Sequence, residues 1–169
     1  MTESKTNVRV KNVFGQCYFN NGKSLISPTE KYEIDYDRKF YLFNVIPIGA
    51  VRMTQSDKWK TNANHVDPKK RQRESVRQYF EFKTAIRTQA EQMNYVLSEV
   101  LDIVFLVPMP FTWSEKKKVK YNKTKVNKRP DLDNYIKAFM DALSIEDGFV
   151  WKIQAEKRYA FNGSILVYA

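Results

Sequence analysis

The chain has 169 residues, 43% of them hydrophobic and 14% aromatic, which is enough to bury the core of one domain and excludes a disordered tail. One cysteine and one histidine exclude an internal disulfide and a zinc site built from these two residues alone. The net charge of +10 suits a polyanionic partner, because neutralised phosphates release counterions, although charge alone is weak support for nucleic acid.

Residues 1–39 are interpreted as an N-terminal extension to which the sequence assigns no role. The stretch CYFNNGKSLIS (17–27) has an Asn-Gly pair between short apolar runs, which predicts a hairpin. The first residues are polar, so no secretory signal is expected, and no apolar run approaches the roughly 20 residues of a membrane span. We therefore expect a cytoplasmic protein without a membrane-spanning helix.

Residues 40–169 are expected to fold as one domain that opens with a buried strand and a long helix. FYLFNVIPIGAVRM (40–53) predicts a buried strand that ends in a Pro/Gly turn, and a polar loop rich in lysine and arginine follows over 56–74. Asp67–Pro68 marks a helix start, so the helix is predicted over 69–93. Its expected apolar stripe is Val76, Tyr79, Phe80, Ile86, Ala90 and Met93.

The second half predicts another strand, a second helix and two closing strands. EVLDIVFLVPMP (99–110) is rich in β-branched residues and ends in two prolines, and FVWKIQAEKRYA (149–160) alternates like a half-covered strand. An Asn-Gly turn then returns the chain as ILVYA (165–169). The apolar stripe of the second helix is Leu132, Ile136, Phe139 and Leu143. This order predicts an α+β fold: one mixed, mostly antiparallel sheet packed with two main helices.

A strongly basic run, SEKKKVKYNKTKVNKR (114–129), precedes the second helix and is interpreted as a loop. It holds eight cations between Lys116 and Arg129 and no acid among them, which favours DNA contact over a merely solvated charge run. Beside it, Trp113 and Tyr121 either stack on unpaired bases or are buried. The candidate DNA-binding residues are Arg52, Lys58, Lys69, Lys70, Arg71, Lys116, Lys117, Lys118, Lys120, Lys123, Lys125, Lys128 and Arg129.

Two aspartates, Asp131 and Asp133, open the second helix. The simplest interpretation is that Asp131 caps the helix while Asp133 forms an ion pair with Lys137, four residues on. However, a cap needs only one acid, and a further acidic pair, Glu146–Asp147, follows the helix. Three converging carboxylates suit a hard cation such as Mg²⁺ or Mn²⁺, which would offset their mutual repulsion.

The stretch RPDLDNYIKAFMDAL (129–143), followed by EDGFVWKIQAEKRYA (146–160), closely resembles the core of the RusA family of Holliday junction resolvases. Earlier, IPIGAVRMTQSDKW (46–59) is similar to the family's first strand and its basic loop. The resemblance covers roughly residues 40–169, and the Asp-x-Asp-Asn-x-x-Lys segment is its most specific part.

The resemblance implies a set of site residues. Asp131, Asp133 and Asp147 take the positions of the metal-binding aspartates, and Lys137 takes that of the essential lysine. The family usually has Asp-Asp before Ser-Gln, whereas this chain has Glu-Asp before Gly-Phe-Val, so Glu146 is the alternative third ligand or a supporting acid.

The resemblance further implies a homodimeric, Mg²⁺-dependent endonuclease of phage or prophage type, acting in DNA recombination and repair in a bacterial cytoplasm. It would resolve four-way junctions by paired nicks, with Mn²⁺ as the alternative metal. Two other hypotheses stay open: a nucleic-acid-binding module of the same fold without the chemistry, and a small basic RNA binder. The cleavage sequence and the metal preference are not determined by the sequence.

Overall fold

The structure, a computed structural model, describes residues 10–11, 17–18, 38–58, 60, 66–67, 71–143 and 148–169. Its main sheet contains β3 (Phe40–Phe43), β4 (Val100–Pro108), β5 (Lys152–Ala160) and β6 (Ser164–Tyr168) in the order β3-β6-β4-β5. β5 runs parallel to β4, and the other two neighbouring pairs are antiparallel.

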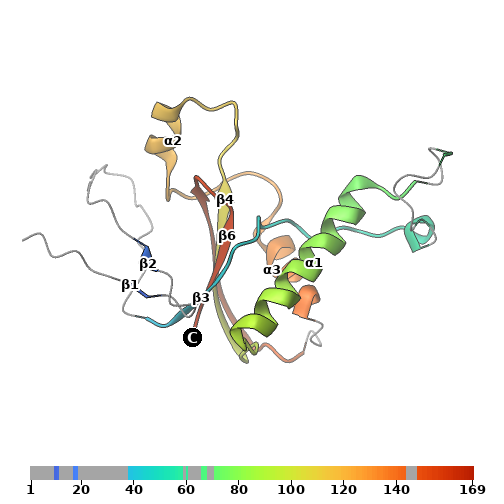
Figure 1. Ribbon diagram of the computed structural model, residues 1–169, viewed down its shortest axis with the longest axis horizontal. Coiled ribbons are helices and arrows are strands. Elements are labelled where there is room, and N and C mark those ends of the chain that lie inside the picture. The colour runs from blue at the N-terminus through green and yellow to red at the C-terminus, as the bar shows by residue number, and fades with distance from the viewer. Residues whose placement is uncertain are drawn as a thin grey trace, which may run out of the picture.

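The helices lie on one side of this sheet and at one end of it (Figure 1). α1 (Glu74–Met93) and α3 (Leu132–Leu143) pack on the same face, whereas the short α2 (Glu115–Tyr121) stands beyond the end of β4. The predicted α+β class is confirmed, with a mixed and mostly antiparallel sheet under two main helices. No helix within the described ranges combines the length and apolarity needed to span a membrane.

Alternating side chains of the central strands build the core. Ile103 and Ile165 face the helices and are fully buried together with Phe139 of α3 and Ile86 of α1. Phe43 of β3 meets Phe139 edge-on, with 5.3 Å between the ring centroids. The intervening side chains of β4 and β6 form a second, smaller cluster on the opposite face. This two-sided burial explains why both strands are nearly continuous apolar runs in the sequence.

The predicted start of the long helix is wrong. α1 begins at Glu74, not at residue 69, because Arg73 has an extended backbone with φ −64° and ψ 138°. The Arg73 guanidinium reaches back to Asp57 and to the carbonyl oxygen of Arg52, which holds this residue out of the helix. The expected stripe is also corrected at one position: Phe80 is 46% exposed, and Phe82 takes its place in the core.

One strand prediction is also corrected, and another is confirmed. The strand predicted to run from residue 40 to the Pro/Gly turn ends earlier, at Phe43, and the residues up to 53 cross toward α3 without joining the sheet. The closing strand predicted after the Asn-Gly turn is found as β6, which pairs with β3 and β4 and does not pair with β5. The turn passes the end of β4. There Gly163 leaves room for Ile46, whose Cγ1 would lie 2.9 Å from an added Cβ.

In the N-terminal extension, β1 (Val10–Lys11) pairs antiparallel with β2 (Cys17–Tyr18). The Asn-Gly turn of the hairpin predicted over 17–27 lies outside the described residues.

Candidate functional site

The start of α3 presents the two aspartates of the sequence motif. Asp131 directly precedes the helix and Asp133 lies in its first turn, and both are exposed. Leu132 and Ile136 pack against the core on the other side of the helix, which turns the polar side outward. The positive end of the helix dipole favours anionic groups at this position.

The interpretation of Asp133 as the ion-pair partner of Lys137 is wrong. Lys137 Nζ instead lies 3.8 Å from Asp141 Oδ1, one turn further on. Asp141 also accepts a 2.7 Å hydrogen bond from the Tyr79 hydroxyl, and burial together with this bond raises the pKa of Tyr79. Within the described residues, Asp133 has one side-chain contact, a long 3.5 Å hydrogen bond from the neighbouring Asn134 amide.

Asp131 has still fewer contacts than Asp133. Within the described part of the chain, Asp131 makes no side-chain hydrogen bond and no ion pair. Two adjacent carboxylates at a helix start therefore keep their oxygens available for a positively charged partner.

The backbone around Asp131 is held from the side of the chain that follows β3. Ala50 N donates a 2.9 Å hydrogen bond to the carbonyl oxygen of Asn134. Beside it, a Cβ added to Gly49 would lie 2.7 Å from Cβ of Pro130, so this close approach requires glycine. The segment 46–59, which is similar to the family's first strand and its basic loop, thus packs through Gly49 and Ala50 directly against the start of α3.

Lys157 of β5 binds the backbone that directly precedes Asp131. Its Nζ donates to the carbonyl oxygens of Lys128 and Pro130 at 2.7 and 2.8 Å, and it lies 6.0 Å from the centre of the Tyr135 ring. No role for Lys157 was predicted from the sequence. The available signal was a lysine at an alternate position of β5, between Ala155 and Tyr159 on the inward side.

We expect Lys157→Met to loosen the segment that ends at Asp131, because two carbonyl oxygens lose a charged donor. The melting temperature should fall by roughly 2–8 °C, corresponding to about 1–2 kcal/mol. Lys152→Met, at an exposed position of the same strand, is the control and should stay within about 0.5 kcal/mol of the wild type. Equal melting temperatures for Lys157→Met and the wild type would show that Lys157 does not stabilise this segment.

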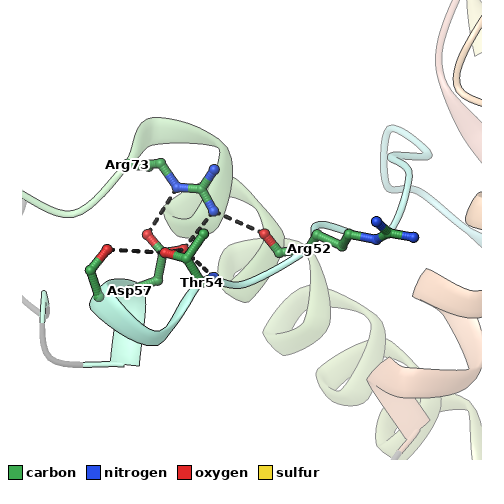
Figure 2. A network of polar contacts seen from close by, with 5 residues as sticks. Arg52, Thr54, Asp57 and Arg73 are labelled. Atoms are coloured by element: carbon green, nitrogen blue, oxygen red, sulfur yellow. Dashed lines mark hydrogen bonds and ion pairs between the residues drawn. The ribbon is translucent and has the colours of Figure 1, made fainter.

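A polar network fixes the loop that carries Arg52 (Figure 2). Asp57, only 5% exposed, accepts hydrogen bonds from the Thr54 amide and hydroxyl at 2.6 and 2.7 Å. Arg73 donates to both Asp57 oxygens at 2.9 and 2.6 Å and to the Arg52 carbonyl oxygen at 2.9 Å. The Thr-x-x-Asp spacing at 54–57, typical of a capping box, was the sequence signal for the 3₁₀ helix Gln55–Lys58.

The charge state of Asp57 makes this network stable near neutral pH. The hydrogen bonds from Arg73, followed by those from Thr54, hold the pKa of Asp57 well below its ordinary value of 3.8. A depressed pKa means that the contribution to stability is complete above about pH 4 and is lost as the pH falls further. The exposed Arg52 side chain extends away from the network, so its backbone is fixed while its guanidinium is accessible (Figure 2).

The basic run is partly helical, which corrects its interpretation as a loop. Ser114 caps α2 by accepting a 3.4 Å hydrogen bond from Lys117 N, and Lys118 pairs with Glu115 at 2.8 Å. We call residues 109–128 the basic arm. Its return segment pairs with the outer edge of β5, where Val126 N donates to the Lys157 carbonyl oxygen at 3.1 Å.

The structure describes most of the candidate DNA-binding side chains. Those exposed are Arg52, Arg71, Lys116, Lys117, Lys120, Lys125, Lys128 and Arg129, and those half-buried are Lys118 and Lys123. The side chain of Lys58 and both Lys69 and Lys70 lie outside the described residues. The exposed cations of the basic arm directly precede Asp131 and Asp133 in the chain.

The acidic pair that the sequence offers as the third ligand lies between α3 and β5. Glu146 and Asp147 lie outside the described residues, and no group of three metal-binding side chains occurs among those described. α3 has 12 residues, so about 18 Å separates its start from Leu143, after which the segment with this acidic pair begins.

Comparison with protein-family models matches residues 47–167 to the endodeoxyribonuclease RusA family. Neither the curated proteins nor the solved structures gave a match. The matched range contains the loop with Arg52, the basic arm, both aspartates, Lys137 and Lys157, and it spans most of the chain. The chain therefore belongs to the RusA family of endodeoxyribonucleases.

Proposed function

We propose that this chain is a divalent-metal-dependent endonuclease that resolves four-way DNA junctions by paired nicks. The observation that supports this most directly is the pair of exposed carboxylates at the start of α3, which Lys137 does not neutralise. Family membership supplies the reaction class, cleavage within a DNA chain at Holliday junctions. Metal dependence, paired cleavage and a homodimer are parts of the proposal.

The donor set fits Mg²⁺. Asp131 and Asp133 offer only carboxylate oxygens, which Mg²⁺ and Mn²⁺ prefer, and Mg²⁺ is typically held by one or two carboxylates plus water. We assign the third position to Asp147, with Glu146 as the alternative. When bound, the metal would polarise a phosphodiester and lower the pKa of an attacking water.

The protein's own cations take the remaining roles. Lys137 is exposed one turn from Asp133, and its 3.8 Å contact with Asp141 is long, so its ammonium can turn to the charge that develops on the phosphate. The basic arm and Arg52 bind the phosphates of the junction arms. Two opposed strands call for two active sites, which a two-fold dimer supplies.

The test uses purified full-length protein and a synthetic four-way junction labelled on each strand. We expect nicks at symmetric positions in two opposed strands with Mg²⁺ or Mn²⁺, none with a chelator, and none in a linear duplex of equal length. Light scattering should give a dimer. Binding to the junction without cleavage in any divalent cation would instead favour the non-catalytic binding module.

Neutralising Lys116, Lys117, Lys118 and Lys120 together to glutamine should weaken binding to all DNA. The slope of log K against log salt should become shallower by about 0.9 for each phosphate that the variant no longer neutralises. Lys118 should contribute least, because it is already paired with Glu115. Lys39→Gln, at an exposed position before β3, is the control. If the slope of log K against log salt does not change, the lysines of the basic arm are solvated and do not contact DNA.

A further inference from the structure

The basic arm is a rigid projection and not a freely hanging loop. It leaves the sheet where Met109 N donates to the Ala160 carbonyl oxygen at 3.0 Å, and it returns along β5. α2 stands beyond the end of the sheet, and none of its side chains is buried (Figure 1). The exposed side chains of α2 are therefore accessible to a partner.

Aromatic rings attach the arm to the sheet. Trp113 lies between Tyr121 and Tyr159, with 5.2 Å from its ring centre to each, beside buried Met109. Lys117 Nζ lies 4.3 Å from the same ring centre. Trp113 is half-buried at the base of the arm, whereas Tyr121 is 37% exposed, so the expected burial is found in part for Trp113 and not for Tyr121.

One aromatic ring of the arm has no such packing. Phe111 is 95% exposed, at the tip of a tight turn that Trp113 N closes on the Pro110 carbonyl oxygen at 3.1 Å. Lys118 Nζ is 5.9 Å from the Phe111 ring centre, and Lys118 is itself held by Glu115. The turn thus holds an exposed ring beside Lys118 at the start of the basic arm, where the ring adds nothing to the core.

Cations and an exposed ring together fit one class of ligand. Lysines attract phosphates of any sequence, whereas an aromatic ring binds nucleobases by stacking on their faces. In a continuous duplex both faces of each base are already covered by neighbouring pairs. At the branch point of a junction the stack is interrupted, so a base face becomes accessible.

We infer that Phe111 stacks on a base at the branch point and gives the basic arm its preference for branched over continuous DNA. This inference rests on one part of the proposed function, namely that the ligand is branched DNA. The lysines of the arm then set how tightly any DNA is bound, and Phe111 sets which shape of DNA is bound.

The test measures binding in the presence of a chelator, so that no cleavage is required. Phe111→Ala should raise the dissociation constant for a four-way junction by about 5- to 150-fold and leave that for a duplex of equal length unchanged. The salt slope should not change, because the same phosphates are still neutralised. Phe111→Trp should bind as the wild type does.

Phe80→Ala is the matched control, since Phe80 is an exposed phenylalanine on α1, away from the arm. A 2-aminopurine at the branch point should be quenched by the wild type and Phe111→Trp but not by Phe111→Ala. Equal weakening of junction and duplex, or a junction affinity within twofold of the wild type, overturns the inference, as does a wild type without preference for the junction. A wild type that binds as expected but never cleaves overturns only the proposed function.

Discussion

Asp133→Asn should abolish junction cleavage in Mg²⁺, with a loss of about 1,000-fold or more, while binding is kept or tightened. The substitution removes a proposed metal ligand and also one negative charge that repels the phosphates. Asp133 is exposed and receives only the long contact from Asn134, so the free energy of unfolding should change by less than about 0.5 kcal/mol. Single-turnover cleavage and junction binding, measured side by side, check both halves of the expectation.

Two controls separate the metal role of Asp133 from a general effect of charge. Glu91→Gln removes an exposed acid from the last turn of α1 and should leave cleavage unchanged. Asp133→Glu keeps a carboxylate but moves it, so partial activity that improves with Mn²⁺ is expected. Cleavage by Asp133→Asn at the wild-type rate would falsify the carboxylate assignment.

Asp147→Asn should remove cleavage as completely as Asp133→Asn if Asp147 is the third ligand. Melting temperature and dimer content should stay at wild-type values, because a single acid in the short stretch between α3 and β5 contributes little to a core. Cleavage across a Mg²⁺ and a Mn²⁺ titration, with light scattering on the same samples, gives the measurement. A metal requirement shifted to much higher concentration would also indicate that a ligand has been removed.

Glu146→Gln is the matched neighbour and distinguishes two alignments of this region. If Glu146 only orients the ligand or its water, its loss should reduce cleavage by about 10- to 100-fold. An active Asp147→Asn with an inactive Glu146→Gln would make Glu146 the ligand. Full activity in both variants would leave two carboxylates and return the interpretation to a binding module.

Local sequence patterns were sufficient for several elements. β4 was expected over 99–110 and is found at Val100–Pro108, because β-branched residues and closing prolines define such a strand without help from distant residues. The helix after Asp131 was equally clear, since its apolar residues repeat with the helical period. The α+β class follows from these elements in order.

Errors arose where a distant residue competed with a local signal. Asp67–Pro68 favours a helix start, but the bond from Arg73 to Asp57, 16 residues earlier, delays α1 to Glu74. The strand after the Asn-Gly turn was predicted correctly, but its partners were not: a tight turn favours pairing of the two strands it joins, whereas β6 pairs with β3 and β4. In both cases the tertiary contact outweighs a preference worth about 1 kcal/mol or less.

The sequence by itself determined which residues can carry the chemistry: an Asp-x-Asp pair at a helix start, a lysine one turn on and a basic run before them. Only the tertiary structure decided how these groups are supported and paired. Lys157 reaches the Pro130 carbonyl oxygen across 27 residues, and Lys137 turns to Asp141, so the two aspartates have no cationic partner in the described part of the chain. Residue type and spacing are local properties, whereas a contact between distant residues depends on the path of the whole chain through the sheet.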